Sequence, residues 1–279
     1  MRFSSELAVA QLAARRAGAV ILGHYRVRPA DAPAANFDLK ADGSPVSRAD
    51  LEANAAILET LRENFAGDAV LSEESPDDDA RLGHERVWIV DPLDGTRGFL
   101  AGTDDFAVHV ALAIKGEPTV SVVYQPVGDR LYWAVAGAGA FLISTGEERG
   151  RRLHCSDLGA LSQQRIGISR HNAPASLLAW LDAAGLRAHA VQLGASQKYA
   201  ALAEGTLEAV VTVTGSEKEW DTCAPELLVR EAGGTVTDGD GKRLRYNQPA
   251  GQIHRPRGIL ASNGRCHDEL LNMIAPLLS

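Results

Sequence analysis

Two aspartates at the end of an apolar run are the residues best placed to do chemistry. Residues 88–99 read Trp-Ile-Val-Asp-Pro-Leu-Asp-Gly-Thr-Arg-Gly-Phe, which sets Asp91 and Asp94 three positions apart. The run before Asp91 predicts a buried strand that stops at Pro92, and Gly95 permits a turn. Crowded carboxylates repel each other, and a hard divalent cation such as Mg²⁺, which takes oxygen ligands, removes that repulsion. The plainer alternative is that Asp94 caps a turn or a helix.

Two further acidic segments strengthen the metal-site interpretation. Glu73-Glu74 follows a short apolar run, and Asp221 stands at the start of a predicted helix. Each has an ordinary explanation, as a solvated loop in one case and as a favourable charge at a helix N-terminus in the other. Together with Asp91 and Asp94 they predict one acidic metal site. A nucleophilic aspartate is disfavoured, because Pro92 occupies the position two before Asp94 where aspartyl-phosphate enzymes carry that residue.

Apolar spacing predicts the elements that must position these side chains. Spacings of three and four predict helices over 6–25 and 51–65, and β-type runs occupy 69–72 and 87–90. Alternating apolar residues with glycine-rich turns over 106–142 predict an antiparallel meander. Beyond residue 150, β-type and helical runs alternate, which is typical of an α/β arrangement. The strand-like and helical runs there are 165–169, 188–193 and 207–213, and 175–184, 196–203 and 222–232.

We therefore predict two portions, an α+β portion over 1–150 that carries most metal ligands and an α/β portion over 151–279 that carries Asp221 and the substrate contacts. The chain has 279 residues and a formal net charge of −8, which disfavours binding to nucleic-acid polymers or anionic membranes. No apolar run is long enough for a membrane span. Three cysteines without a Cys-x-x-Cys pair argue against a disulfide framework or a zinc knuckle, and we expect a cytoplasmic protein.

Taken together, the motifs resemble the inositol monophosphatase family of Mg²⁺-dependent, lithium-sensitive phosphatases. The resemblance covers nearly the whole chain and implies a layered αβαβα sandwich with the active site between its two portions. The segments that carry it are Glu73-Glu74, Asp91-Pro-Leu-Asp94-Gly-Thr96, Trp220-Asp221-Thr-Cys-Ala-Pro and Glu231-Ala-Gly-Gly. Three further segments resemble the CysQ-type 3′(2′),5′-bisphosphate nucleotidase branch, which acts on 3′-phosphoadenosine 5′-phosphate (PAP) and in some members on its sulfated form, PAPS. They are 40–50, Ser169-Arg-His171 and Gly194-Ala-Ser-Gln-Lys198.

The family pattern also implies roles for single residues and about two or three Mg²⁺ ions per site. Asp50 and Thr96 match the pair that activates the attacking water. Asp50 has a structural alternative that is compatible with catalysis, because Ser47-x-x-Asp50 is typical of a helix cap. The positions that match the metal ligands are Glu73, Asp91, the carbonyl of Leu93, Asp94 and Asp221.

The substrate contacts implied by the resemblance lie mostly in the second portion. Backbone N–H groups of Gly95 and Thr96 are expected to face the phosphate. The nucleotidase branch has Ser where Ala195 stands and an acidic residue where Gly98 stands.

The preferred activity is hydrolysis of PAP to AMP and phosphate by a monomer or homodimer. The alternatives are an inositol 1-phosphate or sugar-phosphate phosphatase and a non-catalytic nucleotide sensor. The positions that match substrate contacts are Gly95, Thr96, His171, Gly194, Lys198 and Asp221.

Overall fold

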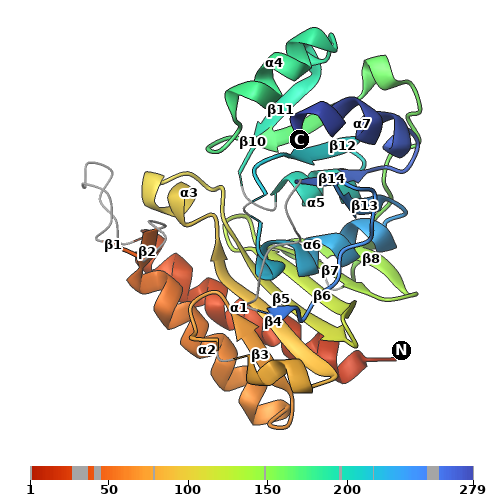
Figure 1. Ribbon diagram of the computed structural model, residues 1–279. Helices are drawn as coiled ribbons and strands as arrows, with labels where there is room; N and C mark the ends of the chain where they lie inside the picture. Colours follow the sequence, from red (N-terminus) through yellow and green to blue (C-terminus); the bar gives the residue numbers. More distant parts are fainter. Residues whose placement is uncertain are drawn as a thin grey trace.

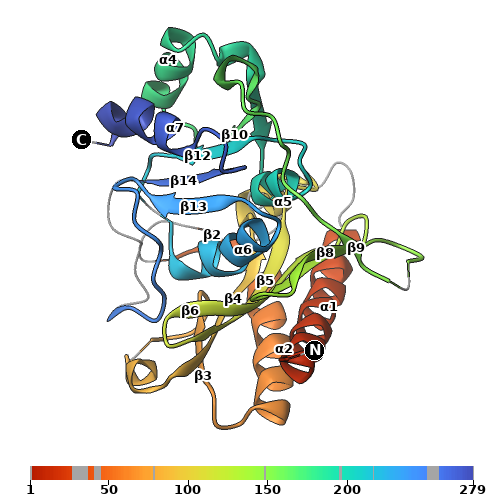
Figure 2. The same cartoon turned by 90° about the vertical axis from the view of Figure 1, so that its right-hand side faces the viewer.

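Two large β-sheets, one two-stranded sheet and three layers of helices make up the part of the chain that the computed structural model describes (Figures 1 and 2). The described residues are 2–26, 37–40, 45–77, 79–147, 149–194, 197–215, 217–249 and 258–278. Residues 41–44 and 195–196 lie outside the described residues. They belong to the segments 40–50 and 194–198 of the nucleotidase pattern. None of the described helices is both long and apolar enough to cross a membrane.

The first sheet has seven strands in the order β3-β4-β5-β6-β7-β8-β9 over the described residues. It contains the predicted meander, in which β4 to β9 pair antiparallel, while β3 pairs parallel with β4. Its last strand lies beyond residue 150, so this sheet extends past the predicted boundary. The strands are β3 (Ala69–Ser72), β4 (Arg86–Asp94), β5 (Ala107–Ile114), β6 (Glu117–Gln125), β7 (Arg130–Val135), β8 (Gly139–Ile143) and β9 (Arg151–Arg152).

The second sheet has the order β11-β10-β12-β14-β13 among the described residues. Its first three strands are parallel, as the alternating pattern predicts, but β14 runs antiparallel to both of its neighbours. The sheet is therefore mixed. Strands β1 (Phe37–Leu39) and β2 (Pro45–Ser47) pair antiparallel in a separate two-stranded sheet. The strands of the second sheet are β10 (Ile166–Ser169), β11 (Ala190–Leu193), β12 (Ala209–Thr212), β13 (Thr235–Asp238) and β14 (Ile259–Ser262).

Helices cover both sheets and fill the space between them, which confirms the predicted αβαβα sandwich. Helices α1 (Ser4–Arg26) and α2 (Arg48–Asn64) pack on one face of the first sheet. Helices α5 (Gln197–Ala203) and α6 (Glu219–Glu231) lie between the sheets, and α4 (Ala175–Ala183) and α7 (His267–Ile274) cover the outer face of the second. The short α3 (Thr96–Ala101) follows β4 directly.

The side chains of β5 alternate between the two layers of helices that cover the first sheet. Val108, Val110 and Leu112 face α1 and α2, while Ala107 and Ala111 face α6. This alternation follows from the two-residue period of a strand. The small side chains on the inner face let α6, and the acidic residue near its start, lie close to the sheet.

One predicted element boundary is wrong. Strand β4 does not stop at Pro92 but continues to Asp94. The register with β5 shifts between Asp91 and Asp94, which marks a bulge or irregularity in the ladder. A bulge leaves one residue without a ladder partner, so a proline is tolerated there.

Candidate active site

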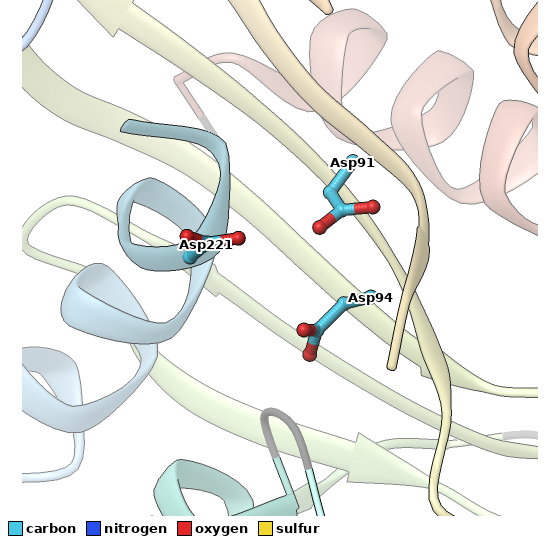
Figure 3. A group of neighbouring side chains, drawn as sticks. All are labelled: Asp91, Asp94 and Asp221. Carbon is cyan, nitrogen blue, oxygen red and sulfur yellow. The ribbon is translucent and has the colours of Figure 1, made fainter. Parts of the chain in front are cut away.

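Asp91, Asp94 and Asp221 converge on one point between the sheets (Figure 3). One carboxylate oxygen from each lies within 4.8 Å of the others. In a regular strand, residues three positions apart point to opposite faces. The irregularity in β4 allows Asp91 and Asp94 to line the same cleft, opposite Asp221 at the start of α6. The structure therefore brings together three of the predicted ligands.

These carboxylates fit a hard divalent cation. Withdrawal from water raises the pKa of Asp91 and of Asp221 well above the usual value, and the charges of Glu73 and Asp94 raise both further. The ligand atoms that the three aspartates offer are all carboxylate oxygens. Mg²⁺ and Mn²⁺ prefer such ligands and neutralise the repulsion. Asp221 also accepts a hydrogen bond of 2.6 Å from the backbone N–H of Lys218, so it caps α6 as well.

Glu73 lines the same cleft but is held by a lysine. Its Oε1 accepts a hydrogen bond of 2.7 Å from Lys40 Nζ, which also donates to Glu74 at 2.6 Å. Burial raises the pKa of Glu74 to about 7, against the opposing effect of Lys40. The geometry places the charge of Glu73 beside the aspartates, and its role as a metal ligand stays a prediction.

Asp50 and Thr96 form the predicted pair. Thr96 Oγ1 lies 3.0 Å from Asp50 Oδ1, to which it donates, and 3.2 Å from the carbonyl oxygen of Leu93, a predicted ligand. Asp50 Oδ2 accepts hydrogen bonds from the backbone N–H and the hydroxyl of Ser47, at 2.8 and 2.6 Å, so the cap of α2 is present too. Burial raises the pKa of Asp50, and the hydrogen bonds from Ser47 and Thr96 oppose that rise.

Gly95 joins β4 to α3 in a conformation that few other residues adopt. Its φ is 95°, in the left-handed region. The turn places Thr96 directly after the aspartates, and both Gly95 and Thr96 line the cleft. The predicted approach of their N–H groups to a phosphate is compatible with this position.

The cleft has a volume of about 410 Å³ and is lined from both sheets. Lys198 lies in it as a buried cation near Asp94 and Asp221. Burial lowers the pKa of Lys198, and these carboxylates counteract the effect. His171 lines an exposed part of the cleft, where its Nε2 is 3.9 Å from Asp105 Oδ2.

Gly194, which matches a substrate contact of the nucleotidase pattern, does not line the cleft. A Cβ built on it would lie 2.3 Å from Asp105 Cβ, so the absence of a side chain permits this close packing. Gly98 is restricted by the same aspartate, because its Cβ would lie 2.9 Å from the Asp105 carbonyl oxygen. A larger side chain at position 98, acidic or not, does not fit in this packing.

Two residues near the site were not predicted from the sequence. Asp105 is 4% exposed, lines the cleft and forms an ion pair with Arg170 from beyond β10. His109 is fully buried on β5, with its Nε2 3.3 Å from Asp94 Oδ2. His109 interrupts an otherwise apolar strand, whereas Asp105 stands in a polar turn before that strand and gives no such signal.

Other motif residues have structural roles. The Glu231 carboxylate accepts hydrogen bonds of 2.8 Å from the backbone N–H groups of Gly137 and Gly139. Gly234 has no room for a side chain, since a Cβ would lie 2.6 Å from the carbonyl oxygen of Ser262. The Glu-Ala-Gly-Gly segment thus holds α6 against its neighbours and does not face the cleft.

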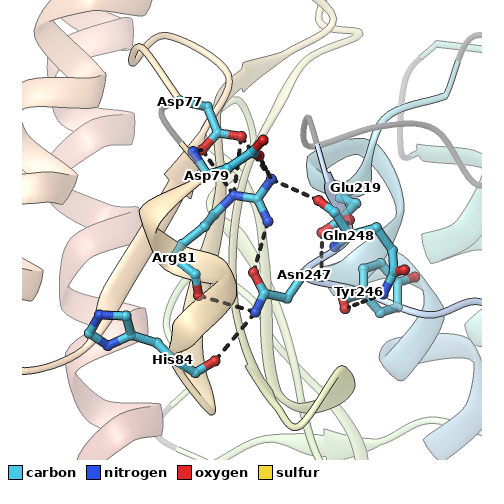
Figure 4. Close-up of polar contacts among 8 residues, drawn as sticks. All are labelled: Asp77, Asp79, Arg81, His84, Glu219, Tyr246, Asn247 and Gln248. Atoms are coloured by element: carbon cyan, nitrogen blue, oxygen red, sulfur yellow. Dashed lines mark hydrogen bonds and ion pairs between the residues drawn. The ribbon is translucent and has the colours of Figure 1, made fainter.

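A buried arginine connects the two portions beside α6 (Figure 4). The guanidinium of Arg81 donates to Asp77, to the Asn247 side chain at 2.8 Å and to the Gln248 carbonyl at 2.8 Å. Glu219 accepts hydrogen bonds of 2.7 Å from the backbone N–H groups of Asn247 and Gln248. This network fixes the first turn of α6, two residues before Asp221.

Comparison with known proteins agrees with this geometry. The sequence profile described as the inositol monophosphatase family matches residues 4–278. The chain is 33% identical over 250 residues to a histidinol-phosphatase of Mycobacterium tuberculosis, covering 85% of this chain and 87% of that protein. It is 34% identical over 239 residues to the 3′(2′),5′-bisphosphate nucleotidase CysQ of Escherichia coli, covering 85% and 92%.

Solved structures give the same result. An IMPase from Thermotoga maritima superposes with a TM-score of 0.80 at 25% identity, over 98% of both chains. CysQ from Bacteroides thetaiotaomicron superposes with a TM-score of 0.75 at 31% identity, over 94% of this chain and 98% of that one. The chain therefore belongs to the inositol monophosphatase family of metal-dependent phosphomonoesterases.

Proposed function

We propose that the chain hydrolyses PAP to AMP and phosphate, as a 3′(2′),5′-bisphosphate nucleotidase. The observation that carries the proposal is the basic lining of the cleft beyond the aspartates, which suits a substrate with a second phosphate. Similarity to the nucleotidase CysQ supports it. The basic residues and the histidine that line the cleft are Arg97, His171, Lys198 and Lys218, of which Lys198 lies near Asp94 and Asp221.

The proposed mechanism assigns a task to each group near the aspartates. Asp91, Asp94 and Asp221, with Glu73 and the Leu93 carbonyl, would hold the divalent cations. When bound, such cations polarise a phosphoryl oxygen and stabilise developing negative charge. The backbone N–H groups of Gly95 and Thr96 would orient the phosphate.

Thr96 and Asp50 would handle the proton of the attacking water. Because Thr96 Oγ1 donates to Asp50, its oxygen is left to accept a hydrogen bond from water. As water attacks the phosphorus in line with the leaving ester oxygen, its proton passes toward this pair. Direct attack by water needs no covalent intermediate.

Histidinol phosphate is the second candidate substrate. The named activity of the Mycobacterium tuberculosis relative suggests it. Two carboxylates outside the predicted ligand set, Asp105 and Glu217, also line the cleft and suit the ammonium group of an amino alcohol phosphate. Inositol 1-phosphate and sugar phosphates remain the alternatives expected from the sequence.

The test is phosphate release with Mg²⁺ from a panel of PAP, PAPS, histidinol phosphate, inositol 1-phosphate and adenosine 3′-monophosphate. The last compound is the matched control, because it differs from PAP only in lacking the 5′-phosphate. A charge-assisted contact contributes about 1.5–3 kcal/mol, so kcat/KM for PAP should exceed that of the control about 10- to 150-fold. Faster hydrolysis of histidinol phosphate or inositol 1-phosphate than of PAP would overturn the nucleotidase assignment. Binding of PAP without phosphate release would indicate a sensor.

A further inference from the structure

His109 faces α6 from β5 of the first sheet. It lies on the same side of β5 as Ala107 and Ala111, which pack in the core against α6. Its exposure is 0%. Polar side chains are seldom fully buried without a polar partner, so the surroundings of the ring are informative.

The ring lies between the two segments that supply the clustered aspartates. Its Nδ1 is 3.1 Å from the carbonyl oxygen of Trp220, the residue before Asp221. Because a carbonyl only accepts, Nδ1 is the donor in this contact. On the other side, Nε2 is 3.3 Å from Asp94 Oδ2. His109 is also the direct cross-strand partner of Asp91 on β4.

The Nε2 atom is aimed at Asp94 but makes no standard hydrogen bond within the described residues. His109 does not line the cleft. Its ring therefore stands behind Asp94, on the side away from the space where substrate would bind. Carboxylates that bind metals are commonly held by polar groups behind them, and loss of such a group typically weakens metal binding about 10- to 100-fold. Nε2 is the atom placed to serve Asp94 in this way.

We propose that His109 is a positioning residue for the metal site. With a proton on each nitrogen, the ring points Nε2–H at the Asp94 carboxylate and donates through Nδ1 to the Trp220 carbonyl, so one ring sets the separation of ligands from β4 and α6. The inference rests on the proposed role of Asp94 as a metal ligand. It concerns the arrangement of the ligands and not the chemical step.

Two amide substitutions separate the two contacts of the ring. The amide nitrogen of Asn corresponds in position to Nδ1, so His109→Asn keeps the contact with Trp220 and loses the one with Asp94. The amide nitrogen of Gln corresponds to Nε2, so His109→Gln keeps the contact with Asp94. His109→Phe removes both.

The measurement is Mn²⁺ binding to the whole protein without substrate, followed by the electron paramagnetic resonance signal of free Mn²⁺. His109→Asn and His109→Phe should raise the Kd about 10- to 100-fold, and His109→Gln should retain most of the affinity. His267→Asn is the matched control, because His267 is a buried histidine bonded to Thr237 and Ser262 and does not line the cleft. It should bind Mn²⁺ as the unmodified chain does.

Asp94→Asn separates failure of the inference from failure of the proposed site. If Asp94→Asn leaves the Kd unchanged, the proposed ligand set is wrong. If Asp94→Asn weakens binding while His109→Asn binds like the unmodified chain, the positioning role is wrong. Tighter binding by His109→Asn than by His109→Gln also contradicts it. These amide variants decide the question even if His109→Phe does not fold.

Discussion

At the scale of single residues, Thr96 connects Asp50 with the clustered aspartates. Its hydroxyl reaches both Asp50 and the carbonyl of Leu93, and its own position follows from the left-handed turn at Gly95. In the proposed mechanism this position lets Thr96 act on the attacking water.

Thr96→Ala should lower kcat about 10²- to 10⁴-fold, because a group that moves a proton in the transition state contributes on that scale. Mn²⁺ affinity should stay nearly unchanged. Thr96→Ser keeps the hydroxyl and is the matched control. Steady-state kinetics with PAP would check this, and a rise in KM without a fall in kcat would assign the hydroxyl to substrate binding.

Lys198 and His171 should differ in their effects on substrate preference. Lys198 is buried near Asp94 and Asp221, so Lys198→Met should lower kcat/KM for PAP and for adenosine 3′-monophosphate alike. His171 lies in an exposed part of the cleft, so His171→Ala should raise KM for PAP while changing the monophosphate little. Equal effects of His171→Ala on both substrates would exclude a contact with the second phosphate.

At the scale of elements, close approach between loops shapes the cleft. Asp105 precedes β5, and the absence of side chains at Gly98 and Gly194 allows both glycines to pack against it. The ion pair between Arg170 and Asp105 joins the end of β10 to the same point. These contacts connect the two sheets beside the cleft.

Gly194→Ala should lower the free energy of unfolding by about 1–3 kcal/mol, as overpacking of a dense site does. It should also raise KM for PAP, because the added methyl group displaces Asp105 beside the cleft. Gly67→Ala is the control, since its Cβ would meet no atom within 4 Å. Urea unfolding of both variants is the measurement, and equal midpoints would contradict the described packing.

The sequence predicts most elements and the aspartate cluster, but not the contacts that arrange them. Asp91 and Asp94 could be predicted as site residues because both carboxylates follow one apolar run. The continuation of β4 past Pro92 depends on a bulge that no local preference specifies. His109 was not predicted as a site residue because its Trp220 partner lies 111 positions away.

At the scale of the whole molecule, the layered architecture brings three aspartates together, and their carboxylates repel one another. Strand β4 supplies two aspartates, and α6, packed between the sheets, supplies the third. Burial in this arrangement raises the pKa of Asp91 and Asp221 above the usual 3.8. The sandwich thus brings together repelling groups that a cation would stabilise.

The metal-free protein should lose stability as pH rises. Between the unfolded pKa and the raised folded pKa, the folded chain binds more protons than the unfolded chain, so the free energy of unfolding falls with rising pH. In EDTA, Tm should therefore decrease as the pH rises above the unfolded aspartate pKa of about 4, and less steeply in Asp91→Asn. Calorimetric scans of both proteins would check this, and identical slopes would contradict it.

The most direct measurement is phosphate release from PAP as a function of Mg²⁺ concentration, made in parallel on the unmodified chain and on Asp91→Asn and Asp221→Asn. The unmodified chain should be inactive in EDTA and gain activity with Mg²⁺, while both variants should lose most activity at every concentration. Undiminished hydrolysis in EDTA, or an unchanged Mg²⁺ response in the two variants, would contradict the assignment of these aspartates as the metal site.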